Sequence, residues 1–246
     1  MAELLTGKAL NLHMPKYYKH LFFDLDHTLW DFDANSKHTL KELYQKLELQ
    51  QKGVYDFELF HTNYLAHNEK LWERYRNGFI KVEELRVKRM WQTLLDFKLG
   101  DQLLAETMAT QFLDMLPTRT LVFPHTFESL DYLTNKGYQL HLITNGFEKT
   151  QHSKLQNSGL HKYFAEVITS EGSNSLKPHK EIFEYAMNRV NCGADECIMI
   201  GDSIEVDIQG AMNAGMDQVF VNHLCIECTV KPTYEIRSLK ELEKIF

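Results

Sequence analysis

The chain has 246 residues, of which 43% are hydrophobic and 25% charged, and its formal net charge is -7 at pH 7. This composition supplies a substantial core. The acidic balance excludes a broad basic surface and so argues against nucleic acid or an anionic membrane as the main partner. No apolar run is long enough to span a bilayer.

Two features indicate a reducing compartment. The cysteines, Cys192, Cys197, Cys225 and Cys228, do not form the pattern of a disulfide framework in a chain of this size. The first residues lack the compact apolar core of a secretory signal. We therefore expect a cytoplasmic protein that is a monomer or a small homo-oligomer. Cys225 and Cys228 beside His223 suggest zinc, but no second cluster accompanies them and incidental thiols are the preferred interpretation.

The first regular element is predicted in the stretch Leu21-Phe22-Phe23-Asp24-Leu25-Asp26-His27-Thr28-Leu29. An unbroken apolar run of this kind is typical of a buried strand in a parallel sheet. The run ends in two carboxylates one residue apart, followed by a threonine. Because ligands bind at the carboxyl ends of the strands in an open α/β sheet, these acids indicate a functional site.

The segment 35–116 has a helical pattern throughout, with apolar residues at three- and four-residue spacing. Asn35 or Ser36 is the expected N-cap of its first helix. Pro117 breaks the pattern. After the first helix, three more are expected at about 56–76, 81–97 and 101–116.

Strands and helices alternate in the remainder of the chain. Strands are expected at 138–144, 166–169, 197–200 and 218–221, and helices at 126–135, 148–157, 180–190 and 206–214. This alternation is typical of a doubly wound, mostly parallel α/β sheet. We predict an α/β core at 18–34 and 117–246, interrupted by an all-helical cap at 35–116. Residues 1–17 are expected to be an N-terminal extension without fixed structure.

Polar groups of a few types follow the predicted core strands. Since strand exits lie along one edge of a doubly wound sheet, we expect these groups to converge. Each alone has an ordinary explanation as a turn residue or a solvated lysine, and the joint pattern favours a site. The groups are Asp24 and Asp26, Thr144-Asn145-Gly146, Lys177-Pro178, Gly201-Asp202-Ser203 and Asp207.

The acids suit phosphoryl transfer. Asp24, Asp26 and Asp202 are the expected ligands of Mg2+, a hard cation that prefers oxygen. Once the metal shields the anions, Asp24 can attack phosphorus and form an aspartyl phosphate. Asp26 can then protonate the leaving oxygen and later activate water.

The other polar groups suit binding. Thr144, Asn145 and Lys177 are expected to hold the phosphoryl oxygens, with backbone N–H groups near a helix start completing the cradle. Asp207 is expected either to lie beside the metal or to pair with Lys177.

These motifs resemble those of the haloacid dehalogenase-like superfamily of phosphohydrolases, from about Tyr18 to the C-terminus. The resemblance implies the roles given above, dependence on Mg2+, a Rossmann-like core and a helical cap after the first strand. One departure is His27, where the family most often has glycine. The four matching motifs are Asp24-Leu25-Asp26-His27-Thr28-Leu29, Ile143-Thr144-Asn145-Gly146, Lys177-Pro178 and Gly201-Asp202-Ser203-Ile204-Glu205-Val206-Asp207.

The second acid, Asp26, favours phosphoryl transfer over halide removal, because halide-cleaving members of the family need no proton donor there. The runs Trp30-Asp31-Phe32 and Asn145-Gly146-Phe147 resemble the branch of bacterial pyrimidine nucleotide 5′-monophosphatases. The expected substrate is therefore a small phosphorylated metabolite, a nucleoside 5′-monophosphate. Alternatives are a phosphoglycolate or sugar-phosphate phosphatase, a phosphomutase and, outside the enzymes, a receiver-type phosphoacceptor module.

Several aromatic residues of the predicted cap have two interpretations. Their rings either stack on a base or only pack the helices together. These residues are Trp72, Tyr75, Phe79 and Trp91.

Overall fold

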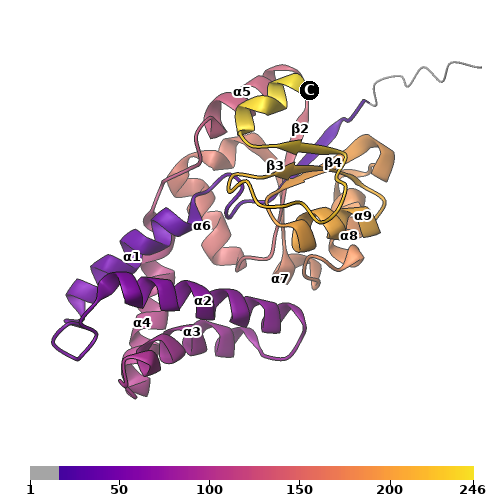
Figure 1. The fold of residues 1–246 in the computed structure, drawn as a ribbon. Helices are drawn as coiled ribbons and strands as arrows, with labels where there is room; N and C mark the ends of the chain where they lie inside the picture. Colours follow the sequence, from indigo (N-terminus) through magenta and orange to yellow (C-terminus); the bar gives the residue numbers. More distant parts are fainter. Residues whose placement is uncertain (1–16) are drawn as a thin grey trace, which may run out of the picture.

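The computed structural model describes residues 17–246, so the extension predicted at 1–17 lies outside the described residues except for its last position. The described chain forms two parts, which Figure 1 shows one above the other. The upper part is a sheet with helices on both faces. The lower part consists of four consecutive helices, α1 to α4, which we call the insert.

The sheet has six parallel strands in the order β3-β2-β1-β4-β5-β6. β1 lies at the centre, where Phe23 aligns with Leu142 on one side and Ile200 on the other. This arrangement confirms the predicted α/β class. The last strand was not predicted, because a segment of three residues is too short to show a recognisable pattern of apolar residues. The strands are β1 (His20–Phe23), β2 (Gln139–Thr144), β3 (Phe164–Thr169), β4 (Cys197–Gly201), β5 (Asp217–Val221) and β6 (Tyr234–Ile236).

Alternate side chains of β1 enter two different apolar layers, as the two-residue period of a strand requires. Leu21 and Phe23 pack on the face that α5 (Thr126–Asn135), α6 (Glu148–Ser158) and the short helix η5 (Leu239–Lys244) cover. Phe22 packs on the opposite face, beneath α8 (Lys180–Val190) and α9 (Gly210–Asn213). Because β1 is buried on both faces, its exit at Asp24 has a fixed position.

The insert comprises α1 (Phe32–Lys46), α2 (Phe57–Arg76), α3 (Val82–Asp96) and α4 (Gln102–Met115). α3 packs between α2 and α4. Aspartates cap α2 and α4, since Asp56 accepts from Leu59 N at 3.1 Å and Asp101 from Leu104 N at 2.9 Å. The apolar interior of the insert is continuous with the α5 face of the sheet.

The N-cap predicted for the first helix is wrong. The cap is Asp31, whose side chain accepts from Ala34 N at 2.9 Å. Asn35 is buried instead, and its amide donates to the carbonyls of Asp31 (2.7 Å) and Leu121 (2.8 Å). Asn35 therefore ties α1 to the segment by which the chain returns to the sheet, whereas Ser36 donates only to Asp33 O.

Several short elements connect the longer ones. The predicted helix 206–214 is in fact a π-helical turn followed by α9. Ser203 O accepts from both Asp207 N (2.9 Å) and Ile208 N (3.1 Å), and the second bond gives the wider turn. The short elements are η1 (Leu116–Thr118), η2 (Leu160–Tyr163), α7 (Ser170–Ser173), η3 (Ala194–Glu196) and η4 (Ile204–Gln209).

The late loop with Cys225 and Cys228 gathers no metal-binding group among residues 17–246. His223 stacks on Phe123 with ring centroids 4.0 Å apart, and Cys228 donates to Val230 O. All four cysteines are free thiols.

Within residues 17–246, every helix is too short or too polar to cross a membrane.

Two histidines lie side by side inside the sheet. His20 of β1 and His141 of β2 are both buried, with His20 Nδ1 3.0 Å from His141 Nε2. Burial and the neighbouring His20 lower the pKa of His141 to about 4, and burial also lowers the pKa of His20. At a pH below 6.5, the pKa of an unperturbed histidine, the unfolded chain therefore binds protons at these histidines that the folded protein does not bind. Stability therefore falls as the pH drops from 6.5 towards 4.

We predict that His141 alone makes the free energy of unfolding about 2 kcal/mol smaller at about pH 5 than at about pH 7. Urea unfolding across this range should show a shallower pH dependence in His141→Leu than in the wild type. His152→Gln, which removes an exposed histidine of α6, serves as the control and should keep the wild-type slope. Equal slopes in all three proteins would contradict the prediction.

Candidate active site

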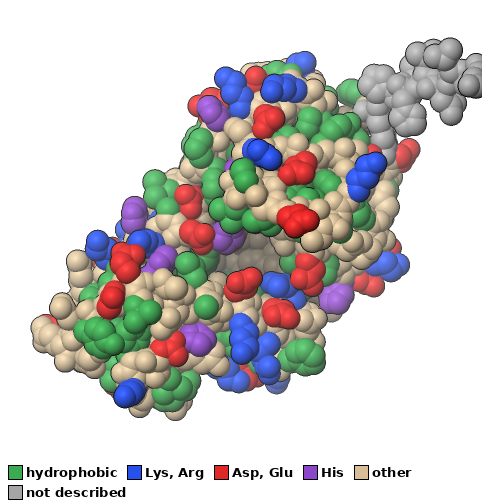
Figure 2. All heavy atoms as spheres, in the orientation of Figure 1, with side chains coloured by type: hydrophobic (Ala, Val, Ile, Leu, Met, Phe, Trp, Pro, Cys, Tyr) green, Lys and Arg blue, Asp and Glu red, His purple; other side chains and the backbone are tan. Residues whose placement is uncertain are grey.

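The carboxyl ends of three neighbouring strands bring the predicted groups together. Asp24 follows β1, and its backbone N–H donates to Ile200 O at 2.9 Å, which extends the ladder to β4. Thr144 is the last residue of β2, and Asp202 follows β4 directly. This edge of the sheet faces the insert, and the molecular surface is hollowed between the two parts (Figures 1 and 2).

A buried ammonium group lies at the centre of the site. Lys177 Nζ donates to Asp24 Oδ1 (2.5 Å), to Asp207 Oδ1 (2.7 Å) and to Ile143 O (2.7 Å). Burial alone would lower the pKa of Lys177, but the charges of Asp207 and Asp24 outweigh it and raise this pKa. The lysine is therefore charged, and the expected pairing of Asp207 with Lys177 is present.

Asn145 fixes the backbone that carries this lysine. Its side-chain amide donates to Lys177 O at 2.8 Å, and its oxygen accepts from Lys177 N at 2.8 Å. Two bonds of this kind imitate a pair of strand hydrogen bonds and hold the loop against the end of β2. The Asn145 side chain is thus occupied in placing Lys177, which leaves its backbone for any contact with phosphate.

Three carboxylates gather beside the lysine. Asp24, Asp202 and Asp207 each place an oxygen within 4.8 Å of the others. Burial and the charges of the two other acids raise the pKa of Asp24 to about 8, against the opposing charge of Lys177. Burial and the Asp207 charge raise the pKa of Asp202 to about 7, while the Thr28 hydroxyl at 2.8 Å opposes the shift. Buried, crowded oxygens of this kind fit a hard divalent cation, whose charge would favour the ionised forms of Asp24 and Asp202.

Asp207 reaches this position because Gly201 has no side chain. A Cβ at Gly201 would lie 2.4 Å from Asp207 Oδ2, far inside van der Waals contact. The same oxygen accepts from Ser203 N at 3.1 Å, across the π-helical turn. Gly201, the last residue of β4, is therefore required for the packing of Asp207.

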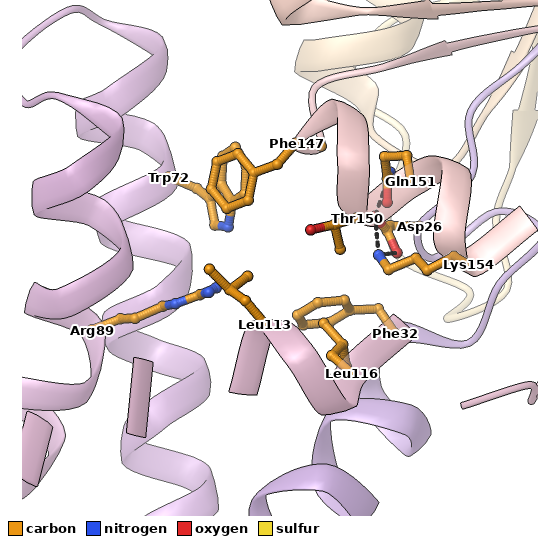
Figure 3. A pocket seen from close by; sticks show the side chains of 11 residues that line it. Asp26, Phe32, Trp72, Arg89, Leu113, Leu116, Phe147, Thr150, Gln151 and Lys154 are labelled. Carbon is orange, nitrogen blue, oxygen red and sulfur yellow. Dashed lines mark hydrogen bonds and ion pairs between the residues drawn. The ribbon is translucent and has the colours of Figure 1, made fainter. Parts of the chain in front are cut away.

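The side chain of Asp26 is not in the group of three acids. Its oxygens accept from Lys154 Nζ at 2.6 and 2.8 Å, and Oδ2 also accepts from Gln151 Nε2 at 2.9 Å (Figure 3). Gln151 Nε2 donates to Thr144 Oγ1 as well, at 2.6 Å. One chain of polar contacts therefore joins Asp26 to the predicted phosphate-binding threonine.

Lys154 and Gln151 were missed in the sequence. Lys154 is only 2% exposed, and its ammonium lies 4.3 Å from the centre of the Trp30 ring and 5.6 Å from that of Phe32. Burial lowers the pKa of Lys154, while Asp26 opposes this change. The available signal was the spacing of Gln151, Lys154 and Leu155, which places all three on one face of α6.

The turn after Asp26 accommodates the histidine that departs from the family pattern. His27 has a φ of 65°, in the left-handed region where glycine is most comfortable and where histidine is tolerated. Its N–H donates to Trp30 O at 2.9 Å. The ring is partly exposed, with Nδ1 3.9 Å from Asp33 Oδ1.

A narrow pocket of about 30 Å³ separates the site from the insert. Trp72 of α2 and Phe147 meet across it with ring centroids 5.5 Å apart and planes inclined by 23°. Of the four aromatic residues singled out in the sequence, Trp72 lines this pocket, whereas Phe79 is exposed. The pocket is lined by Asp26, Phe32, Trp72, Arg89, Leu113, Leu116, Gly146, Phe147, Thr150, Gln151 and Lys154 (Figure 3).

Two known proteins are similar to this chain over most of its length. The pyrimidine 5′-nucleotidase PynA of Streptococcus pneumoniae is 33% identical over 229 residues, covering 92% of this chain and 94% of that protein. The pyrimidine 5′-nucleotidase YjjG of Escherichia coli is 30% identical over 230 residues, covering 92% and 96%.

A solved structure has the same fold. The putative hydrolase YfnB of Bacillus subtilis, solved with bound magnesium and described as revealing interdomain movement, matches with a TM-score of 0.84 at 28% identity. The match covers 94% of this chain and 99% of that one. Residues 18–215 also match the model of a hydrolase family described as haloacid dehalogenase-like hydrolase. The chain belongs to the haloacid dehalogenase-like hydrolase family.

Proposed function

We propose that the protein is a Mg2+-dependent phosphatase that hydrolyses a nucleoside 5′-monophosphate through an aspartyl phosphate. The observation that carries this proposal is the buried contact of Lys177 with both Asp24 and Asp207, with Asp202 in the same group. The lysine supplies a positive charge for an anionic substrate. The three carboxylates suit a divalent cation that would neutralise more of the substrate's charge. The names of the two nucleotidase relatives support the choice of substrate.

Asp24 and Asp202 are the proposed metal ligands, with Asp207 beside them. The acidic group provides the oxygen donors that Mg2+ prefers, and a bound Mg2+ supplies charge neutralisation for the phosphate and the attacking carboxylate. That Asp26 is a further metal ligand stays a prediction. In the structure its carboxylate accepts hydrogen bonds from Lys154 and Gln151.

Asp24 is the proposed nucleophile. Lys177 holds Oδ1, which fixes the carboxylate plane and directs the other oxygen at phosphorus. As this oxygen bonds to phosphorus, the ester bond breaks and Asp26 gives its proton to the leaving oxygen. Asp26 then takes a proton from water, whose oxygen attacks phosphorus and releases Asp24. Thr144 and the backbone N–H groups of Asn145 and Gly146 hold the remaining phosphoryl oxygens.

The insert is the proposed cap, and it provides the binding site for the leaving group. Trp72 and Phe147 offer ring faces on which a base stacks. A pocket of about 30 Å³ holds no more than a few water molecules, so a nucleoside enters only when the insert moves away from the sheet. The movement described for the YfnB structure is consistent with this requirement.

A substrate panel tests the proposal. With Mg2+ present, we expect kcat/KM for pyrimidine nucleoside 5′-monophosphates to exceed that for phosphoglycolate and sugar phosphates by about tenfold or more, because only the nucleotides use the aromatic faces. A chelator should abolish the activity, and added Mg2+ should restore it. Poor turnover of all nucleotides would contradict the substrate assignment, and full activity in chelator would contradict the metal assignment.

Lys154 should be required for the proton transfers, because it holds the Asp26 carboxylate with two contacts. In Lys154→Met we expect kcat for an aryl phosphate to fall about tenfold or more. Methionine keeps the length of the side chain beside Trp30 and Phe32, so the melting temperature should change little. Lys149→Met, which removes an exposed lysine of the same helix, is the matched control. If both variants turn over the ester like the wild type, Asp26 is not positioned by Lys154.

A further inference from the structure

Arg89 is a buried cation that the proposed chemistry does not use. It lies on α3, is only 2% exposed and lines the pocket on the side of the insert (Figure 3). Phe112 and Tyr64 flank its guanidinium, with ring centres 5.0 and 6.0 Å away. These faces fix the plane of the group without giving it an opposite charge.

The hydrogen bonds of Arg89 are incomplete. Nη1 donates to Asn68 Oδ1 at 3.0 Å, while Nε and Nη2 are buried and have no hydrogen-bond partner within residues 17–246. No carboxylate within these residues forms an ion pair with Arg89. Burying donors of a charged group without acceptors is costly. The arrangement therefore calls for an acceptor that residues 17–246 do not provide.

The two unpaired nitrogens form one recognition edge. In a guanidinium group, Nε and Nη2 carry hydrogens that point the same way, so together they make a fork. Asn68 occupies the other edge through Nη1. Since arginine has donors only, the ligand must present an acceptor atom to this fork.

The position of the fork indicates which part of the substrate it meets. Asp26, Gln151 and Lys154 line the pocket from the sheet side, and Arg89 lines it from the insert (Figure 3). Asp26 is the proposed proton donor to the leaving oxygen, so the leaving group starts at Asp26 and extends towards Arg89. For a nucleotide, the base is the part of the leaving group that lies far from the phosphate.

We propose that Arg89 is a specificity-determining residue whose Nε and Nη2 donate to the C2 carbonyl oxygen of a pyrimidine base. This inference rests on the proposed function. Uracil, thymine and cytosine share the C2 oxygen, whereas adenine and guanine have none at C2. At C4, uracil presents an acceptor and cytosine presents a donor. A group that carries donors and no acceptor can therefore recognise both bases at C2 but not at C4. The fork therefore recognises uracil and cytosine nucleotides through the one acceptor at the same ring position that both bases share.

The test compares Arg89→Met and Arg89→Lys with the wild-type enzyme in the presence of Mg2+. The substrates are UMP, CMP and p-nitrophenyl phosphate, which has no base. In both variants we expect kcat/KM for UMP and CMP to fall together by about tenfold to a hundredfold relative to p-nitrophenyl phosphate. The fall should appear mainly as a higher KM, because the contact exists before and during the reaction.

Two further measurements sharpen the result. Lys88→Met removes a cation from the same helix, on its solvent-exposed side, and should keep the wild-type preference for nucleotides. The 5′-monophosphate of pyrimidin-2-one riboside keeps the C2 oxygen and lacks the C4 group, so Arg89→Met should impair its turnover as much as that of UMP. If Arg89→Met does not fold, Arg89→Lys, which keeps the charge and loses the fork, carries the comparison.

Three results would overturn the inference. A parallel fall for nucleotides and p-nitrophenyl phosphate would assign Arg89 a merely structural role. A fall for UMP without a fall for CMP would place the contact at C4. An unchanged preference for nucleotides in both variants would show that the fork contacts no base. If the wild-type enzyme hydrolyses p-nitrophenyl phosphate and no nucleotide, the proposed substrate fails first and this inference fails with it.

Discussion

The buried ammonium of Lys177, held between Asp24 and Asp207, is the interaction on which the site depends. Removing one partner of such a buried group leaves an uncompensated charge, at a cost of about 3 to 5 kcal/mol. Much of the surrounding sequence keeps these partners in place. Asn145 clamps the lysine backbone, and Gly201 leaves room for the Asp207 carboxylate. Burial and the crowding of three acids around one lysine raise the pKa values of Asp24 and Asp202.

The two parts of the molecule contribute different constraints. The sheet holds its charged groups at the ends of strands that are buried on both faces. The insert contributes Trp72, Leu113 and Arg89 to the pocket, and it meets the sheet side at Phe147. Under the proposed function, the sheet provides the reacting groups and the insert provides part of the leaving-group site. The polar chain from Lys154 through Asp26 and Gln151 to Thr144 lies where the two parts meet.

The sequence predicted the groups at the strand exits because parallel strands end at one edge, whatever the details of packing. It failed where tertiary burial reverses the usual behaviour of a residue type. Lys154 lies in the middle of a helix, where a lysine is normally solvated, and only its burial against Trp30 reveals its role. The unpaired edge of Arg89 is likewise a property of the packed insert. The N-cap at Asp31 was missed because Asn35, a good capping residue, is used inside the helix to bind Leu121.

The central claim is that Asp24 forms a covalent bond to phosphorus. The most direct measurement is rapid acid quenching of the enzyme during turnover of a nucleotide with Mg2+, followed by mass spectrometry of its peptides. We expect the added mass of one phosphoryl group on the peptide that contains Asp24. We also expect that Asp24→Asn keeps the fold, because asparagine retains an oxygen that can accept from Lys177, and that it shows no adduct and does not turn over. Full turnover by Asp24→Asn, or an adduct on another residue, would contradict the account.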